Sequence, residues 1–239
     1  MFPLNVIIQR EKSADENIRL GAIPSLSLDV IIQQGRTADD NIRLGAWRER
    51  LKMGRFAKNF QDLGLLFTTN TVLDWKKIFH LPRYALIVMN SLKYCVENDW
   101  FELYAYVLMP NHIHLIFKAL KNHTIEQISR DFNKYTAQQI LLTMREQNPK
   151  MLDSFWVGTK KQNYKIWQED GDIKNVISSQ FLLQKTEYIH NNPLRGDWRN
   201  FLKVENPEDY EYSSARFYLK GIEDKYVRLT DLRKLVVPC

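Results

Sequence analysis

The chain has 239 residues, of which 44% are hydrophobic and 26% charged, values that exclude collagen-like and disordered proteins and allow one ordinary domain or two small ones. Lys and Arg number 34 against 28 Asp and Glu, and the net charge of +6 permits a polyanionic partner without requiring one. The two cysteines form neither a disulfide framework nor a Cys-x-x-Cys motif, which favours a reducing, cytoplasmic environment. Because we find no membrane-spanning apolar stretch and no signal peptide, we expect no membrane partner.

The first fifty residues contain an internal duplication. Residues 5–22 and 29–46 align at an offset of 24, with 12 of 18 positions identical. Two copies are too few for a solenoid. One interpretation is a small DNA-binding or oligomerisation arm, and the one we favour is a recent duplication upstream of an original start at Met53. We therefore expect residues 1–52 to form an extension outside the core domain, which would comprise residues 53–239.

The next elements predict a strand, a helix and a hairpin. Residues 63–73 are rich in β-branched and aromatic side chains, which is typical of a strand. Residues 81–98 have apolar positions at helical spacing and a proline in the first turn. Residues 101–109 and 112–120 predict two strands, and the short Pro110-Asn111 turn between them predicts an antiparallel hairpin.

The remaining elements predict a helix, a strand and a last helix. Thr124 and Gln127 form a capping box that opens a helix, with these apolar residues on one face: Ile125, Ile128, Phe132 and Tyr135. Residues 147–162 are polar and predict a loop, and residues 164–167 predict a short strand. A helix capped by Ser178 or Ser179 ends before Pro193. The fold class is therefore α+β, with a central antiparallel sheet and helices packed on it.

His112 and His114 are the first candidate site residues. Residues i and i+2 of a strand project to one face, so the two imidazoles stand side by side while Ile113 points away. Neighbouring imidazoles are natural ligands for a divalent metal. Alternatively, the two histidines cap a turn and fill a sheet face, and the pattern alone leaves both interpretations open.

Tyr188 and Asn192 share one face of the last predicted helix. A tyrosine beside a metal-ligating amide is a candidate nucleophile, because a nearby cation favours the reactive phenolate. Taken alone, these residues are more simply a core aromatic and a helix-terminal asparagine.

Scattered cations and aromatics are candidates for DNA contact, because cations can follow phosphates and aromatic rings can stack on unpaired bases. For any single residue, ordinary surface or half-buried packing is the better interpretation. The candidates are Arg130, Lys134, Lys165, Trp167 and Arg195.

Three motifs together resemble the HUH single-tyrosine transposases, where HUH denotes two histidines separated by a hydrophobic residue. Residues 106–117 (YVLMPNHIHLIF) resemble the histidine motif, and residues 187–196 (EYIHNNPLRG) resemble the catalytic-tyrosine segment. Residues 211–215 (EYSSA) resemble the tail motif of the REP-associated, IS200-like branch. The similarity spans about residues 58–219, and residues 1–52 have no counterpart in it.

This resemblance implies a ferredoxin-like sandwich in which the histidine pair on a central strand faces the tyrosine on a helix. It implies that Tyr188 is the nucleophile and that a Mg²⁺ or Mn²⁺ ion is held by three ligands: His112, His114 and Asn192. The implied activity is metal-dependent nicking and strand transfer on single-stranded DNA with hairpin repeats, through a 5′-phosphotyrosine intermediate. The implied assembly is a monomer or a homodimer.

Two other functions remain open at this point. A DNA-binding relative that has lost catalysis would show no metal dependence. A metal-dependent nuclease in which the histidine pair activates water would cut DNA without forming a covalent protein–DNA adduct. The chain has no Walker A loop and no Gly-rich phosphate loop, so we expect no ATP site.

Overall fold

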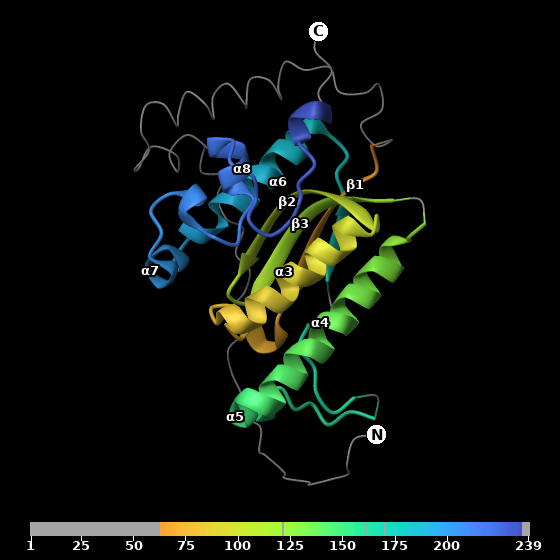
Figure 1. Ribbon diagram of the computed structural model, residues 1–239, viewed down its shortest axis with the longest axis vertical. Coiled ribbons are helices and arrows are strands. Elements are labelled where there is room, and N and C mark those ends of the chain that lie inside the picture. The colour runs from red at the N-terminus through yellow and green to blue at the C-terminus, as the bar shows by residue number, and fades with distance from the viewer. Residues whose placement is uncertain (1–62, 121, 161, 170, 236–239) are drawn as a thin grey trace, which may run out of the picture. The chain divides into compact units, whose positions relative to one another are not determined.

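The computed structural model describes residues 63–235 except residues 121, 161 and 170 (Figure 1). The predicted extension, residues 1–52, lies outside the described residues. Within the described part of the chain, no helix is long and apolar enough to cross a membrane.

A four-stranded sheet forms the centre of the domain. Its strands are β1 (Leu65–Thr71), β2 (Phe101–Met109), β3 (His112–Ala119) and β4 (Asp172–Asn175), in the order β2-β3-β1-β4. Every neighbouring pair is antiparallel, so β1 runs parallel to β2 and β3 runs parallel to β4, each pair with one strand between them. Helices connect both of these parallel pairs, which gives the two interleaved split βαβ units of a ferredoxin-like sandwich. The predicted α+β class and sheet are confirmed.

The β2–β3 hairpin follows the predicted ranges closely and turns at Pro110-Asn111. Tyr104 is an extra residue in β2, because Leu103 pairs with Phe117 and Ala105 pairs with Ile116. Such a bulge interrupts the alternation of side chains along a strand. Tyr104 and Ala105 consequently face the same side of the sheet, and the strand continues from there with its alternation restored.

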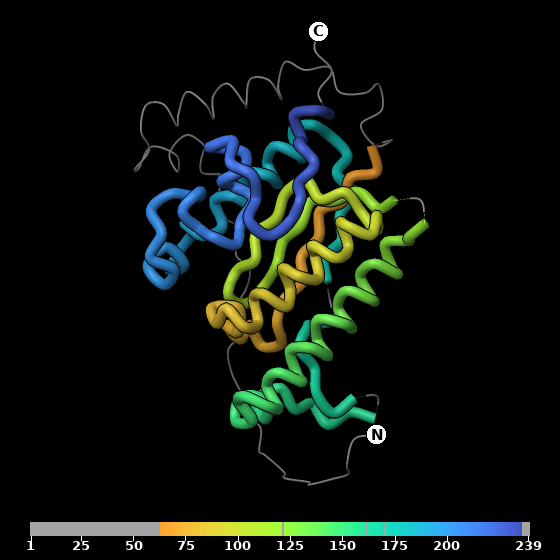
Figure 2. The backbone as a smooth tube through the Cα atoms, viewed as in Figure 1, coloured from red at the N-terminus to blue at the C-terminus, as the bar shows by residue number. Residues whose placement is uncertain are grey.

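One face of the sheet is covered by α3 (Pro82–Glu97) and α4 (Ile125–Gln147), which lie side by side in Figure 1 and in the tube of Figure 2. Pro82 occupies the first turn of α3, and the Thr124–Gln127 capping box begins α4, as predicted. The predicted apolar face of α4 is correct for Ile128 and Phe132 but wrong for Tyr135, whose side chain is exposed.

The opposite face of the sheet is covered by α6 (Ser179–Asn191), whose N-cap is Ser178, one of the two serines predicted for this position. The two faces have separate cores. Leu66, Ile113 and Phe117 pack with α3 and α4, whereas Leu65, Phe67 and Ile116 pack with Leu182 and Ile189 of α6. Because side chains alternate along β3, residues 112 and 114 face α6.

Two predictions for residues 147–175 were wrong in position. The segment predicted as a loop contains the short helix α5 (Pro149–Asp153). Residues 164–167 form only isolated bridges, and the fourth strand is β4. All four residues of β4 are exposed, so the strand lacks an apolar periodicity and is defined by its pairing with β1.

The C-terminal part of the domain consists of short helices. These are α7 (Trp198–Leu202) and α8 (Ala215–Lys220), together with short 3-10 helices at η3 (Asn192–Leu194), η4 (Pro207–Asp209) and η5 (Leu232–Leu235). A further 3-10 turn, η2 (Leu73–Trp75), follows β1. Residues 212–214 lie along the outer edge of β2, where Leu108 N donates to Tyr212 O (2.9 Å) and Ser214 N donates to Tyr106 O (3.0 Å).

Candidate functional site

The histidine pair lies at the start of β3, on the face that α6 covers. The ring centroids of His112 and His114 are 4.7 Å apart, and both side chains are buried. Ile113 lies on the opposite face in the α3–α4 core. The prediction that the two imidazoles share a face is confirmed by this placement.

Each imidazole is oriented through its Nδ1 atom. His112 Nδ1 donates to Asn111 Oδ1 (2.7 Å), and His114 Nδ1 lies 2.8 Å from Thr69 Oγ1 of β1. Both rings therefore turn their Nε2 atoms away from these supports. His114 Nε2 is buried and has no hydrogen-bond partner among the described residues. An orphaned buried nitrogen is costly unless a ligand or ion completes it, so this atom fits a metal site.

Both imidazoles are in the protonation state that a metal ligand needs. Burial lowers the pKa of His112 to about 4, although a hydrogen bond with Asn192 acts in the opposite direction. Burial also lowers the pKa of His114 to about 2, and the positive charges of Lys185 and Arg195 act in the same direction, as does His112 when it is protonated. Both rings are therefore neutral at pH 7 and each retains a lone pair for coordination.

Asn192 provides the third polar group of the site. It follows directly on α6 at the start of η3, it is buried, and its side chain hydrogen-bonds to His112. Within the described ranges, no three His, Cys, Asp or Glu side chains converge on a common point. Asn192 carries a neutral amide oxygen, a donor type that hard divalent cations accept.

Tyr188 lies next to the histidine pair. Its ring centroid is 5.0 Å from that of His114, in an edge-on arrangement, and the side chain is half-buried. The Arg195 guanidinium lies 4.5 Å from the centre of the tyrosine ring, and Lys185 Nζ lies 5.5 Å from it. Two cations and the neutral His114 imidazole thus lie around the tyrosine ring.

Helix α6 is attached to the sheet by a buried hydroxyl. Ser214 Oγ accepts from Tyr106 N of β2 (3.0 Å) and lies 2.9 Å from His190 Nε2 of α6. His190 comes two residues after Tyr188. The EYSSA segment, residues 211–215, therefore closes the β2 edge and holds the helix that carries the tyrosine.

The structure brings only some of the predicted DNA-contact residues to this site. Arg195 lies against Tyr188, as described above. Arg130 pairs with Asp131 (2.8 Å), and Lys165 pairs with Glu169 (2.6 Å). Lys134 is exposed on α4, the helix on the opposite face of the sheet from α6. Trp167 is buried, and its indole donates to Thr136 Oγ1 (2.9 Å), which favours a packing role over base stacking.

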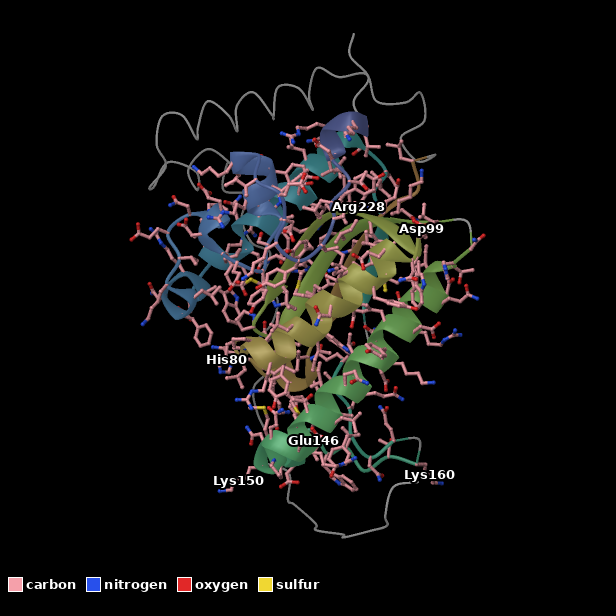
Figure 3. All side chains as sticks on the ribbon, in the orientation of Figure 1. His80, Asp99, Glu146, Lys150, Lys160 and Arg228 are labelled. Atoms are coloured by element: carbon pink, nitrogen blue, oxygen red, sulfur yellow. The ribbon has the colours of Figure 1, made fainter. Side chains whose placement is uncertain are left out.

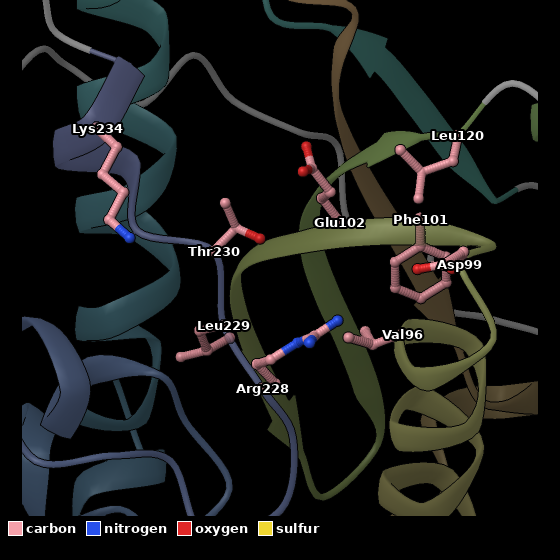
Figure 4. A pocket seen from close by; sticks show the side chains of 9 residues that line it. All are labelled: Val96, Asp99, Phe101, Glu102, Leu120, Arg228, Leu229, Thr230 and Lys234. Atoms are coloured by element: carbon pink, nitrogen blue, oxygen red, sulfur yellow. The ribbon is translucent and has the colours of Figure 1, made fainter.

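A separate pocket of about 260 Å³ lies at the other end of the β2–β3 hairpin. Figure 4 shows Arg228 of the C-terminal segment extending across it toward Val96 of α3. Asp99, Glu102 and Lys234 also line it, so its walls carry both signs of charge. Because Phe101 begins β2 whereas His112 begins β3, this pocket is remote from the histidine pair and takes no part in the site.

Sequence reasoning missed three residues that shape the site. Thr69 and Asn111 support the imidazoles, and Lys185 lies beside the tyrosine. The position of Asn111 next to His112 and the three-residue spacing of Lys185 and Tyr188 on one helix were available signals. Thr69 had no local signal, because it reaches His114 only through the pairing of β1 with β3.

Comparison with known proteins finds a family match over the site. Residues 76–192 match the family model described as "Transposase IS200 like", and this segment includes all four candidate residues, His112, His114, Tyr188 and Asn192. No curated protein matches the chain.

Two solved structures are similar to this chain. One is a REP-associated tyrosine transposase bound to a REP hairpin, with 17% identity over 77% of this chain and 95% of that chain and a TM-score of 0.49. The other is described as a transposase from Deinococcus radiodurans R1, with 21% identity over 53% of this chain and 88% of that chain and a TM-score of 0.35.

Proposed function

Residues 76–192 belong to the IS200-like transposase family, and from this premise we propose that the protein nicks and rejoins single-stranded DNA with Tyr188 as its nucleophile. The observation that carries the proposal is the convergence of Tyr188 with His114, whose ring centroid is 5.0 Å away and whose Nε2 is buried with no hydrogen-bond partner in the described part of the chain. A tyrosine placed solely for packing would not account for an orphaned imidazole nitrogen beside it.

The residues present fit a divalent ion, Mg²⁺ or Mn²⁺. His112 and His114 would hold it through neutral imidazole nitrogens and Asn192 through its amide oxygen, a donor set that suits Mn²⁺ better than Mg²⁺. When bound, the ion would supply positive charge beside the scissile phosphate. Thr69 and Asn111 would fix the orientations of the two ligand rings, the role that outer hydrogen bonds play at metal sites.

The covalent step follows from the position of the phenol. Tyr188 Oη loses its proton to solvent and forms a bond to phosphorus, while the bond from phosphorus to the 3′ oxygen breaks. That oxygen takes up a proton, so the products are a free 3′-hydroxyl and a 5′-phosphotyrosine. Attack by another 3′-hydroxyl reverses these steps and joins the strands. One ester bond replaces another at each stage, so no nucleotide cofactor is required.

The cations beside Tyr188 would hold the DNA backbone in this proposal. Arg195 and Lys185 lie against the tyrosine ring, where their charges can contact the phosphates on either side of the scissile one. The substrate we propose is a single strand next to a hairpin repeat, because the EYSSA segment resembles the tail motif of the REP-associated branch.

Trapping the covalent adduct tests the proposal. A fluorescent single-stranded hairpin oligonucleotide is incubated with the protein and Mn²⁺, and the products are separated on a denaturing gel. We expect the wild type to form a protein–DNA adduct, and Tyr188→Phe to bind the DNA without forming it. Tyr94→Phe, an exposed tyrosine on α3, is the matched control and should react as the wild type does.

Each alternative has its own outcome in this assay. Equal cleavage by the wild type and Tyr188→Phe would exclude Tyr188 as the nucleophile and leave Tyr210 and Tyr212 as the next candidates. Cleavage without any adduct would indicate a nuclease that activates water. Binding without cleavage, with or without metal, would indicate a relative that has lost catalysis.

A further inference from the structure

An aromatic cluster lies beside the histidine pair on the side away from Tyr188. We define it as Trp75, Trp198 and Phe201. The ring centroids of Trp75 and Trp198 lie 6.3 and 6.5 Å from that of His112, and Trp198 contacts Phe201 edge-on at 5.7 Å. The cluster therefore begins at the proposed metal site and continues along α7.

The cluster is open to solvent to an unusual degree. Trp75 is 59% exposed and Phe201 is 42% exposed. Large aromatic side chains contribute most to stability when they are buried, so exposed ones grouped next to a candidate site suggest an interaction surface. The proposed chemistry at Tyr188 does not explain why they are there.

The backbone that presents Trp75 is constrained. Asp74 and Trp75 have φ angles of 54° and 55°, a left-handed conformation that is unfavourable for residues other than glycine. The Asn111 side chain holds this turn, since its Nδ2 donates to Trp75 O (3.2 Å). The Oδ1 of the same side chain accepts from His112 Nδ1. One asparagine thus fixes both the proposed ligand ring and the exposed tryptophan.

Positive charge accompanies the aromatic rings. Lys77 Nζ lies 5.1 Å from the centre of the Trp198 ring and 4.6 Å from that of Phe201. His80 contacts Phe201 edge-on at 6.1 Å, and Figure 3 shows His80 beside α7. Lys77 forms no ion pair with another described residue, so its ammonium is available to an anionic ligand, whereas His80 Nδ1 already donates to Lys77 O.

We propose that Trp75, Trp198 and Phe201 form a stacking subsite for unpaired bases next to the scissile phosphate. Aromatic faces beside a flexible cation are the combination that binds single-stranded nucleic acid, because every base has a stacking face and every link carries a phosphate. Stacking on a base is stronger than an exposed cation–π contact, so a base can displace Lys77 and leave its ammonium for the phosphate. The choice of DNA as the occupant rests on the proposed function.

The histidine pair separates the tyrosine from the aromatic cluster. Tyr188 lies on the His114 side of the site, and the cluster lies on the His112 side. A strand whose scissile phosphate lies at the histidine pair would place the attacked phosphorus next to Tyr188 and the adjoining bases on the cluster. Duplex DNA could not use the cluster in this way, because its bases are already stacked and paired.

Binding in chelator tests the subsite independently of catalysis. The full chain is titrated, in excess EDTA, into a fluorescent oligonucleotide with a hairpin and a single-stranded flank, and Kd is measured by anisotropy. We expect Trp75→Ala and Phe201→Ala each to weaken binding by about 5- to 100-fold. Tyr94→Ala removes an equally exposed aromatic ring from the far end of α3 and should leave Kd unchanged. Circular dichroism melting shows whether each variant is folded, and Trp75→Phe should restore most of the affinity.

Abasic nucleotides identify what the cluster binds. Removing single bases along the flank should weaken wild-type binding at one or two positions and have little further effect in Trp75→Ala, because the same contact is already lost. Additive losses at every position, or folded cluster variants that bind as tightly as the wild type, would overturn the subsite and instead favour a protein partner for this surface.

The result separates this inference from the proposed function. If the wild type forms the Tyr188 adduct while the cluster variants keep wild-type Kd, only the subsite is refuted. If no adduct forms but the cluster variants lose affinity for the single strand, the subsite is supported and the nucleophile is refuted.

Discussion

Replacing Ser214 with alanine removes a hydroxyl that joins strand β2 to the helix carrying Tyr188. The Ser214 side chain is fully buried, and its Oγ lies 3.0 Å from Tyr106 N, 3.2 Å from Tyr106 O and 2.9 Å from His190 Nε2. The substitution creates almost no cavity, so its effects come from these polar contacts. The backbone bond from Ser214 N to Tyr106 O remains in the variant.

The expected loss of stability follows from the Tyr106 backbone amide, which is left without a hydrogen-bond acceptor in the variant. Deleting one partner of a buried hydrogen bond costs about 1–3 kcal/mol, and the Tyr106 amide loses the acceptor described above. We therefore expect a loss of about 2 kcal/mol in the free energy of unfolding. For a domain of this size, that loss corresponds to a fall in Tm of about 4–8 °C.

The substitution should slow catalysis as well as weaken folding. A shift of about 1 Å in a reacting group can slow a reaction by about 100-fold, and His190 lies only two residues from Tyr188. We expect Ser214→Ala to slow adduct formation by about 10- to 100-fold at 25 °C, where the variant is still folded.

Melting monitored by circular dichroism and single-turnover adduct formation measure the two effects. Ser91→Ala is the matched control, since Ser91 is buried in α3 and its hydroxyl donates to Ile87 O of the same helix (2.7 Å). It should melt within about 2 °C of the wild type and react normally. Wild-type Tm and rate in Ser214→Ala would refute the role of this hydroxyl, and a lower Tm with an unchanged rate would refute its role in positioning α6.

Three further predictions concern the metal ligands and the N-terminal segment. His112→Ala and His114→Ala should each lower the rate of adduct formation by orders of magnitude. Ile113→Val is the control and should leave the rate unchanged, because Ile113 faces the other core. Histidine variants that cut DNA normally in EDTA would exclude a metal role for the pair. Asn192→Ala should lower the rate of adduct formation less than either histidine substitution does, because water can replace an amide oxygen as a ligand. Added Mn²⁺ should restore more of the variant's activity than added Mg²⁺. Equal rescue by both ions would contradict the assignment of Asn192 as a ligand. A chain beginning at Met53 should fold and form the adduct at the full-length rate, and loss of either property would show that the duplicated segment belongs to the domain.

Local sequence signals were sufficient to predict most of the helices and strands. The β2–β3 hairpin was predicted because alternating apolar strands and a Pro-Asn turn lie within one continuous stretch of chain. The beginnings of α3, α4 and α6 were predicted from Pro82, the Thr124–Gln127 box and Ser178, since capping chemistry depends on residues one turn apart. The opposite orientations of Ile113 and the histidine pair follow from strand geometry alone.

Contacts between distant parts of the chain decided the position of the fourth strand and the burial of Trp167, which local sequence signals did not predict. Strand β4 has no apolar pattern and exists because β1 offers it a free edge, so the sequence pointed to residues 164–167 instead. Trp167 was a candidate for stacking on DNA, but its neighbours in the fold bury it against Thr136.

Some features of the candidate site likewise follow from the sequence, and others depend on the tertiary structure. The amino-acid sequence by itself determined that His112 and His114 share a strand face and that Tyr188 and Asn192 share a helix face, because each pair is separated by one structural repeat. Only the tertiary structure decided that these two faces meet, that Thr69 supports His114, and that Trp75 is displayed beside His112. Those contacts join residues from 37 to 74 positions apart, a range over which side-chain periodicity carries no information.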